Sequence, residues 1–122
     1  MGSVLVVDGA NVVGSRPDGW WRDRGGAARR LHEQLVVGDT PHDEVVLVLE
    51  GAAKGGVPAG RDGHLRTVHA VGNGDDTIVA EAKRAAQQGH DVEVVTADRI
   101  LQLRVAAVGA TTLPPTWLLD RI

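Results

Sequence analysis

The sequence contains no cysteine, no phenylalanine and no tyrosine, and three tryptophans are its only large aromatic residues. The absence of cysteine excludes disulfide bonds, thiol catalysis and thiolate-bound zinc, and it fits a reducing compartment. Because the 43% hydrophobic content comes mainly from Val, Ala and Leu, we expect an aliphatic core. A length of 122 residues predicts one domain, residues 1–122, with enough chain to form that core.

Long apolar runs are also missing. No segment approaches the roughly 18 apolar residues that a membrane span requires, and Asp8 interrupts the first apolar run too early for a signal peptide. We therefore expect a cytoplasmic protein that has no membrane partner.

An excess of positive charge is absent, since 13 Lys and Arg residues stand against 16 Asp and Glu residues and the formal net charge is −3. The chain as a whole is therefore not a polycation that binds nucleic acid through bulk charge. Within residues 16–30, however, five arginines fall close together: Arg16, Arg22, Arg24, Arg29 and Arg30. Such a cluster either contacts phosphates or forms a solvated helix face.

Uninterrupted apolar runs indicate strands that are buried on both faces, as in a parallel sheet covered by helices. They occur at Val4–Val7 and Val45–Leu49, and further strands are expected at Leu65–Val71, Val92–Thr96 and Thr111–Leu113. Helical spacing of apolar residues predicts helices over Asp23–Val37, from Asp75 toward Gly89, over Ile100–Ala107 and after Pro114-Pro115. The segments Val12–Gly19 and Gly51–Gly63 are predicted to be loops. This alternation predicts an α/β fold, a three-layer α/β/α sandwich with a mostly parallel central sheet.

Carboxylates follow these predicted strands. Asp8 and Glu50 come directly after their strands, Asp98 comes two residues after Thr96, and Asp75 opens a helix. Because the carboxyl ends of parallel strands meet at one edge, where ligands bind in such sheets, we expect these acids to converge. Taken alone, Asp75 and Asp98 are better explained as N-caps of helices, and Asp8 is explained about equally well in that way.

Carboxylates gathered at one edge repel one another, by about 4 kcal/mol for two charges about 4 Å apart at an effective dielectric near 20. Such a group needs a counter-ion or must stay partly protonated. Mg²⁺ or Mn²⁺ satisfies this need, because hard cations prefer carboxylate oxygens and keep waters for the substrate. The sequence therefore predicts a site for Mg²⁺ or Mn²⁺.

Three segments, in this order, resemble the NYN-type nucleases of the PIN-like superfamily. They are Asp8-Gly9-Ala10-Asn11 after an apolar strand, Gly74-Asp75-Asp76-Thr77-Ile78, and Val95-Thr96-Ala97-Asp98-Arg99. The resemblance covers nearly the whole chain. It implies a PIN-like fold with strand order 3-2-1-4-5 and a metal-dependent ribonuclease.

The resemblance also implies roles for the acids. By position, Asp8, Asp75 and Asp98 match the catalytic, metal-binding acids of the family. Asp76 is expected either to bind the metal ion as well or to contact the residues that bind it. Glu50 stands where relatives often have Asp before Gly, and its role is left open.

Substrate contacts are expected from polar and basic residues near these acids. Asn11 and Thr96 match polar positions of the family motifs, while Arg16, Arg22 and Arg99 are candidates for contacts to phosphates. The Trp20-Trp21 pair either stacks an unpaired base or covers the edge of the sheet as part of the core.

The expected function is that of a metal-dependent endoribonuclease acting on single-stranded or structured RNA. The alternative is a catalytically inactive domain that binds RNA or a partner protein. A homodimer is left open. An aspartyl phosphatase would need a second acid two residues after Asp8, where Ala10 stands, and no P-loop sequence occurs.

Overall fold

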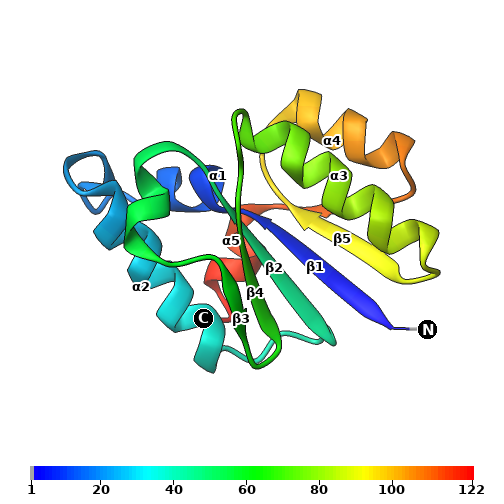
Figure 1. Cartoon of the computed structure of the whole chain (residues 1–122), viewed down its shortest axis with the longest axis horizontal. Helices are drawn as coiled ribbons and strands as arrows, with labels where there is room; N and C mark the ends of the chain where they lie inside the picture. Colours follow the sequence, from blue (N-terminus) through cyan, green and yellow to red (C-terminus); the bar gives the residue numbers. More distant parts are fainter. Residues whose placement is uncertain (1) are drawn as a thin grey trace.

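The computed structural model describes residues 2–122 and has a six-stranded sheet at its centre (Figure 1). Its strands are β1 (Ser3–Asp8), β2 (Glu44–Leu49), β3 (Gly60–Asp62), β4 (Leu65–His69), β5 (Asp91–Val95) and β6 (Thr111–Leu113). The α-helices are α1 (Gly9–Gly14), α2 (Arg24–Val37), α3 (Gly74–Gln87), α4 (Arg99–Ala107) and α5 (Pro115–Leu119). Two short 3-10 helices are η1 (Trp20–Arg22) and η2 (Gly51–Gly56). No helix in this described part is long and apolar enough to span a membrane.

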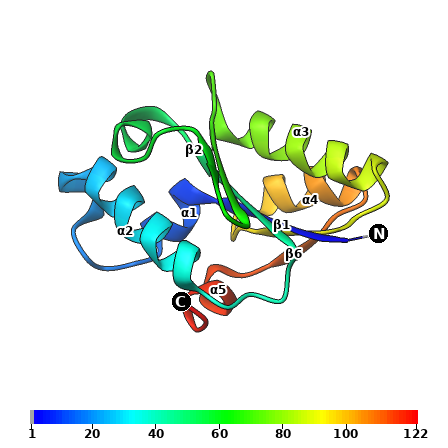
Figure 2. The same cartoon turned by 60° about the horizontal axis from the view of Figure 1, so that its bottom comes forward.

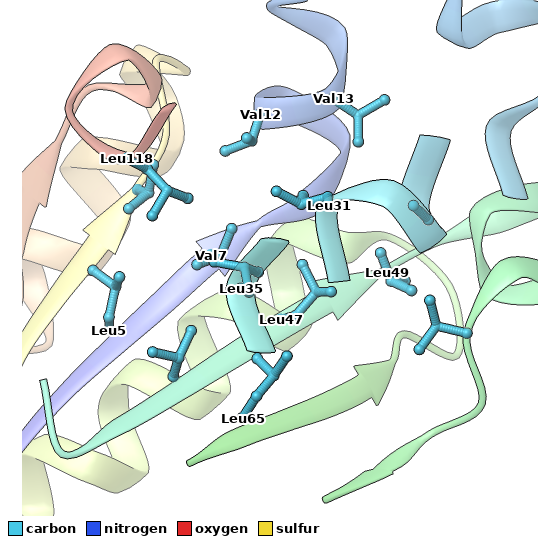
Figure 3. Packing of buried hydrophobic residues seen from close by; sticks show 14 of the residues in the cluster. Leu5, Val7, Val12, Val13, Leu31, Leu35, Leu47, Leu49, Leu65 and Leu118 are labelled. Atoms are coloured by element: carbon cyan, nitrogen blue, oxygen red, sulfur yellow. The ribbon is translucent and has the colours of Figure 1, made fainter. Parts of the chain in front are cut away.

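The sheet separates two hydrophobic clusters. Along β1, Leu5 and Val7 point into one cluster, whereas Val4 and Val6 point into the other. Helices α1, α2 and α5 cover the first face, and α3 and α4 cover the second (Figure 2). Figure 3 shows the aliphatic side chains of the first cluster. The absence of alternation along the strands therefore follows from helices on both sides, as predicted.

The strand order, β3-β4-β2-β1-β5-β6, differs from the predicted 3-2-1-4-5. The prediction is wrong because it omits β3, which pairs antiparallel with β4 at the edge, while the other neighbouring strands are parallel. The five strands that were predicted keep their order among themselves. In particular, β1 lies between β2 and β5, so that the first and fourth predicted strands are adjacent at the centre.

Two predicted loops contain regular structure. The segment after β1 forms α1, because Asp8 caps it and Val12 and Val13 are buried in the core. The glycine-rich segment after β2 forms η2 and β3 instead of a flexible loop. Helix η2 packs so tightly on α2 that a Cβ on Gly56 would lie 1.8 Å from the carbonyl oxygen of Gly25. The hydrophobic pattern of the sequence does not predict this contact, because two glycines that have no side chains form it.

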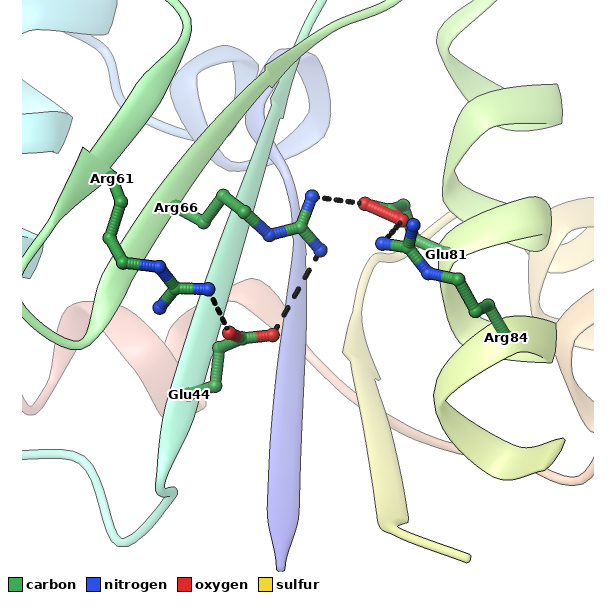
Figure 4. A network of polar contacts seen from close by, with 5 residues as sticks. All are labelled: Glu44, Arg61, Arg66, Glu81 and Arg84. Atoms are coloured by element: carbon green, nitrogen blue, oxygen red, sulfur yellow. Dashed lines mark hydrogen bonds and ion pairs between the residues drawn. The ribbon is translucent and has the colours of Figure 1, made fainter. Parts of the chain in front are cut away.

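A network of charged side chains ties β3 to the rest of the sheet and to α3 (Figure 4). Arg61 on β3 pairs with Glu44 on β2 at 2.6 Å. Arg66 on β4 lies 2.8 Å from Glu81 on α3, which also pairs with Arg84. The Glu81 side chain is only 10% exposed, so water screens its ion pairs less than it would screen surface pairs.

The contact between η2 and α2 makes a testable prediction. Gly56→Ala should lower the free energy of unfolding by about 2 kcal/mol or more, because the new methyl group meets backbone rather than a mobile side chain. Gly55→Ala is the matched control, since a Cβ there meets nothing within 4 Å. Chemical denaturation of both variants measures the difference, and equal stabilities would contradict the close packing of η2.

Candidate active site

The carboxylate of Asp8 ends β1 in a nearly enclosed position, with 5% of the residue exposed. Its Oδ1 accepts a hydrogen bond from the Asn11 backbone N–H at 3.2 Å, which caps α1. Its Oδ2 accepts a hydrogen bond from the Thr96 hydroxyl at 3.0 Å. Gly9 is required here, because a Cβ at that position would lie 2.6 Å from the Val48 carbonyl oxygen. Both Asp8 oxygens are therefore held in place by the chain around them.

Two side chains predicted to contact substrate, Asn11 and Thr96, connect the ends of β1 and β5. The Thr96 hydroxyl, which is fully buried, donates to Asp8 and accepts from the Asp98 backbone N–H at 3.1 Å. The Asn11 side-chain oxygen accepts from the Ala97 N–H at 2.8 Å. These bonds bring Asp8 and the start of α4 together. Thr96 thus acts on the site by positioning Asp8, since its burial keeps it away from ligands.

Asp98 is the N-cap of α4. Its Oδ1 accepts hydrogen bonds from the N–H groups of Ile100 and Leu101, at 2.9 and 3.0 Å. Gln102, one turn later, donates from its side chain to the Thr96 carbonyl at 3.0 Å. Sequence reasoning missed Gln102, and its place in the first turn of α4 is the only signal that points to it. The cap and the predicted site role are compatible, because capping uses only one of the two oxygens of Asp98.

Asp75 and Glu50 complete a group of four carboxylates at the carboxyl edge of the parallel strands. Asp75 lies in the first turn of α3, whose N-cap is Asn73. Glu50 follows β2 and accepts a weak hydrogen bond from the Gly74 N–H at 3.4 Å. A Cβ on Gly74 would lie 2.8 Å from a Glu50 carboxylate oxygen, so the glycine allows this approach. We call Asp8, Glu50, Asp75 and Asp98 the acidic edge.

Electrostatic repulsion couples the members of the acidic edge. Burial raises the pKa of Asp8 from 3.8 to about 6, with smaller increases from the charges of Asp75 and Glu50 and decreases from the hydrogen bonds described above. The pKa of Asp75 is also raised, by burial first and then by the charges of Asp98 and Glu50, while Arg104 opposes the increase. Negative charge at this edge is therefore only partly compensated within the protein.

Three other residues predicted for the site are Asp76, Arg16 and Arg99. The Asp76 side chain, 71% exposed, pairs with Arg104 on α4 at 2.8 Å. Arg16 lies just after α1, and Arg99 is the first residue of α4. Within residues 2–122, neither arginine forms a side-chain hydrogen bond or ion pair. Arg99 directly follows Asp98 in the chain, whereas Arg16 is separated from Asp8 by α1.

The carboxylate oxygens of this edge are the ligand type that Mg²⁺ or Mn²⁺ prefers, but the side chains are not arranged as a complete set of metal ligands. Among residues 2–122, no three Asp, Glu or His side chains lie close enough together to hold an ion as they are oriented here. Mg²⁺ binds through only one or two carboxylates and otherwise keeps waters or takes substrate oxygens. The acidic edge offers such oxygens, whose negative charge is only partly compensated by the protein. The metal site stays a prediction.

Comparison with known proteins identifies structural neighbours only. No protein-family model matches the sequence, and no curated protein matches it. The chain is similar in fold to Rae1 (YacP) from Bacillus subtilis. One crystal structure, of a point mutant of Rae1, has a TM-score of 0.75 at 19% identity, over 97% of this chain and 73% of the Rae1 chain. A second has a TM-score of 0.62 at 19% identity, over 97% and 72%.

At this level of identity, the similarity to Rae1 establishes a shared fold. Because the match spans nearly the whole chain, it includes the strand ends that carry the acidic edge. The two chains therefore share the framework on which these carboxylates are placed.

The raised pKa of Asp8 predicts a pH dependence of stability in metal-free protein. Between about pH 4 and 6 the folded state binds more protons than the unfolded state, so the free energy of unfolding falls as the pH rises. Above the folded pKa of about 6, ionised Asp8 costs on the order of 3 kcal/mol. Asp8→Asn should therefore be more stable than the natural protein at about pH 7.5 and similar near pH 4.

Urea denaturation in EDTA at both pH values measures this difference. Asp91→Asn is the control, because Asp91 lies exposed at the opposite end of β5. A loss of stability in Asp8→Asn that is the same at both pH values would contradict the proposed cost of the buried charge.

Proposed function

We propose that this protein is an endoribonuclease that works with Mg²⁺ or Mn²⁺ at the acidic edge, and that it belongs with the NYN-type nucleases of the PIN-like superfamily. The observation that carries the proposal is the buried Asp8 carboxylate, held through both oxygens and raised in pKa beside Asp75 and Glu50. Burying a carboxylate charge costs free energy, and further carboxylates close to it add repulsion. A bound cation would offset both costs.

Asp8, Asp75 and Asp98 are the residues that would hold the ion, with Glu50 within electrostatic reach of Asp8 and Asp75. When bound, the divalent cation supplies positive charge that polarises a phosphodiester and lowers the pKa of water. The chain contributes orientation, because the Asn11 N–H and the Thr96 hydroxyl leave Asp8 little freedom.

Single-stranded RNA is the proposed substrate. Arg16 and Arg99 have no ion-pair partner within residues 2–122; Arg16 follows α1, which Asp8 caps, and Arg99 begins α4, which Asp98 caps, and both can contact the phosphate backbone. The chain as a whole carries a net charge of −3, so contacts with RNA must be local, and affinity should fall as salt increases.

A non-catalytic domain that binds RNA or a partner protein is the second candidate. One observation favours it: no three acidic or histidine side chains in residues 2–122 are grouped as a ready metal site. Asp76 also forms an ion pair with Arg104, and Asp98 caps a helix, so both acids have structural roles without a metal. The two experiments below separate these candidates.

Metal binding should stabilise the folded protein by mass action. We expect Mn²⁺ at about ten times its dissociation constant to raise the melting temperature by about 5 °C. Asp8→Asn should lose most of this response, whereas Asp91→Asn should keep it. Differential scanning fluorimetry of EDTA-treated protein measures the shift, and identical shifts in the two variants would place the ion elsewhere.

Cleavage should depend on Asp98. Asp98→Asn keeps the side-chain oxygen that caps α4, so the variant should fold while losing one negative charge at the site. We expect the rate of RNA cleavage to fall about a hundredfold, which corresponds to about 2.7 kcal/mol of transition-state stabilisation. EDTA should abolish cleavage by the natural protein.

The assay compares Asp98→Asn, Asp91→Asn and natural protein, purified identically and checked by circular dichroism. Equal activity in all three would indicate a contaminating nuclease. No activity in any of them, on RNAs of different sequence, would favour the binding domain.

A further inference from the structure

A cleft of about 310 Å³ opens next to the acidic edge, between the end of β2, helix α1, η1, the start of α2 and η2. Its volume falls at the lower end of the roughly 300–1,000 Å³ that is common for ligand sites. The residues that line it are Gly9, Ala10, Val13, Trp20, Arg24, Leu49, Glu50, Gly51 and Ala53. The predicted catalytic acids do not line this cleft, and it therefore needs an explanation of its own.

The walls of the cleft combine apolar, aromatic and cationic groups. Trp20 is partly buried against the core, and the Arg24 guanidinium lies 5.3 Å from the centroid of its ring. Within residues 2–122, Arg24 forms no ion pair with a carboxylate. An indole ring beside an unpaired guanidinium is the combination on which unstacked nucleobases pack. Trp21, by contrast, is 55% exposed and does not line the cleft.

The cleft is continuous with the acidic edge. Gly9 and Ala10 follow Asp8 directly in the chain, and Glu50 belongs to both regions. A base held in the cleft would therefore place its own sugar and phosphate near the acids. The adjoining arginine-rich segment, residues 16–30, provides positive charge on the same side of the molecule.

The other concentration of arginines does not offer a comparable site. Arg61, Arg66 and Arg84 surround an open hollow at the far end of the sheet, but each already pairs with Glu44 or Glu81 (Figure 4). No aromatic side chain lines that hollow. A nucleotide there would have to displace existing ion pairs, whereas Arg24 in the Trp20 cleft contacts the indole ring and forms no ion pair with a carboxylate within residues 2–122.

We propose that the Trp20 cleft binds one unpaired base of an RNA strand and so sets which phosphate lies at the acidic edge. The proposal rests on RNA being the ligand of this protein, as proposed above, but not on cleavage. Trp20 and the Arg24 plane provide the stacking surface, and Glu50, which lines the cleft and also belongs to the acidic edge, places the two regions next to each other. Double-stranded RNA, whose bases are stacked and paired, should enter the cleft poorly.

The test measures binding without cleavage. Fluorescence anisotropy in EDTA follows a labelled single-stranded RNA of about six nucleotides, within the range of common single-strand sites. An abasic strand of the same length is the second probe. Trp20→Leu should weaken binding of the intact strand about tenfold, and Trp20→Phe should restore most of it, because base stacking on an aromatic ring is lost and then regained.

Trp21→Leu is the matched control and should change binding of the intact strand by less than about twofold. The abasic strand should bind weakly and equally to natural protein and Trp20→Leu. A Trp20→Leu effect of the same size on both strands would overturn the proposal, and so would a larger effect of Trp21→Leu. If Trp20→Leu fails to fold, equal binding of intact and abasic strands by the natural protein is the overturning result.

Cleavage assays distinguish this proposal from the nuclease assignment. Base-dependent binding through Trp20 without metal-dependent cleavage would support base binding in the Trp20 cleft and contradict the proposed nuclease activity. If the natural protein cleaves RNA and both Trp20→Phe and Trp20→Leu cleave at the same positions, the nuclease activity is supported. The proposal that the Trp20 cleft sets the cleaved phosphate is then overturned.

Discussion

A single hydroxyl group, that of Thr96, connects the two central strands at the point where the acids gather. It donates to the Asp8 carboxylate and accepts from the Asp98 backbone, while the Asn11 side chain makes a parallel link to Ala97. These bonds hold the starts of α1 and α4 together at the ends of β1 and β5, although the two helices cover opposite faces of the sheet, and they surround the buried Asp8 carboxylate. Since a buried charge is tolerated only with such partners, Asp8 depends on the strand pairing and the helix starts together.

Close packing around glycine makes this edge possible. Gly9 lies against the backbone of β2, and Gly74 lies against the Glu50 carboxylate. A side chain at either position would push α1 or Glu50 outward and spread the negative charges. The same principle operates where Gly56 meets Gly25, which holds η2 in place as a wall of the Trp20 cleft. Small residues therefore shape the cleft and the acidic edge, although they contribute no chemistry themselves.

The acids divide into two groups according to how their charge is balanced. Asp98 and Asp76 have protein partners, a helix N-terminus for the first and Arg104 for the second. Asp8 and Asp75 have a raised pKa because burial and neighbouring carboxylates outweigh their hydrogen bonds and cations. A cation brought to this edge would act first on Asp8 and Asp75. Helix capping and charge at the acidic edge are therefore compatible in one fold.

The sequence by itself determined the central sheet, because uninterrupted Val and Leu runs are stable only between two layers of helices, and it placed Asp8, Asp75 and Asp98 at one edge. Only the tertiary structure decided the rest. It turned Asp76 toward Arg104, buried Thr96, and formed β3 and η2 from a segment predicted to be a loop. Those outcomes depend on contacts between residues far apart in the chain, such as Arg61 with Glu44, which no local period encodes.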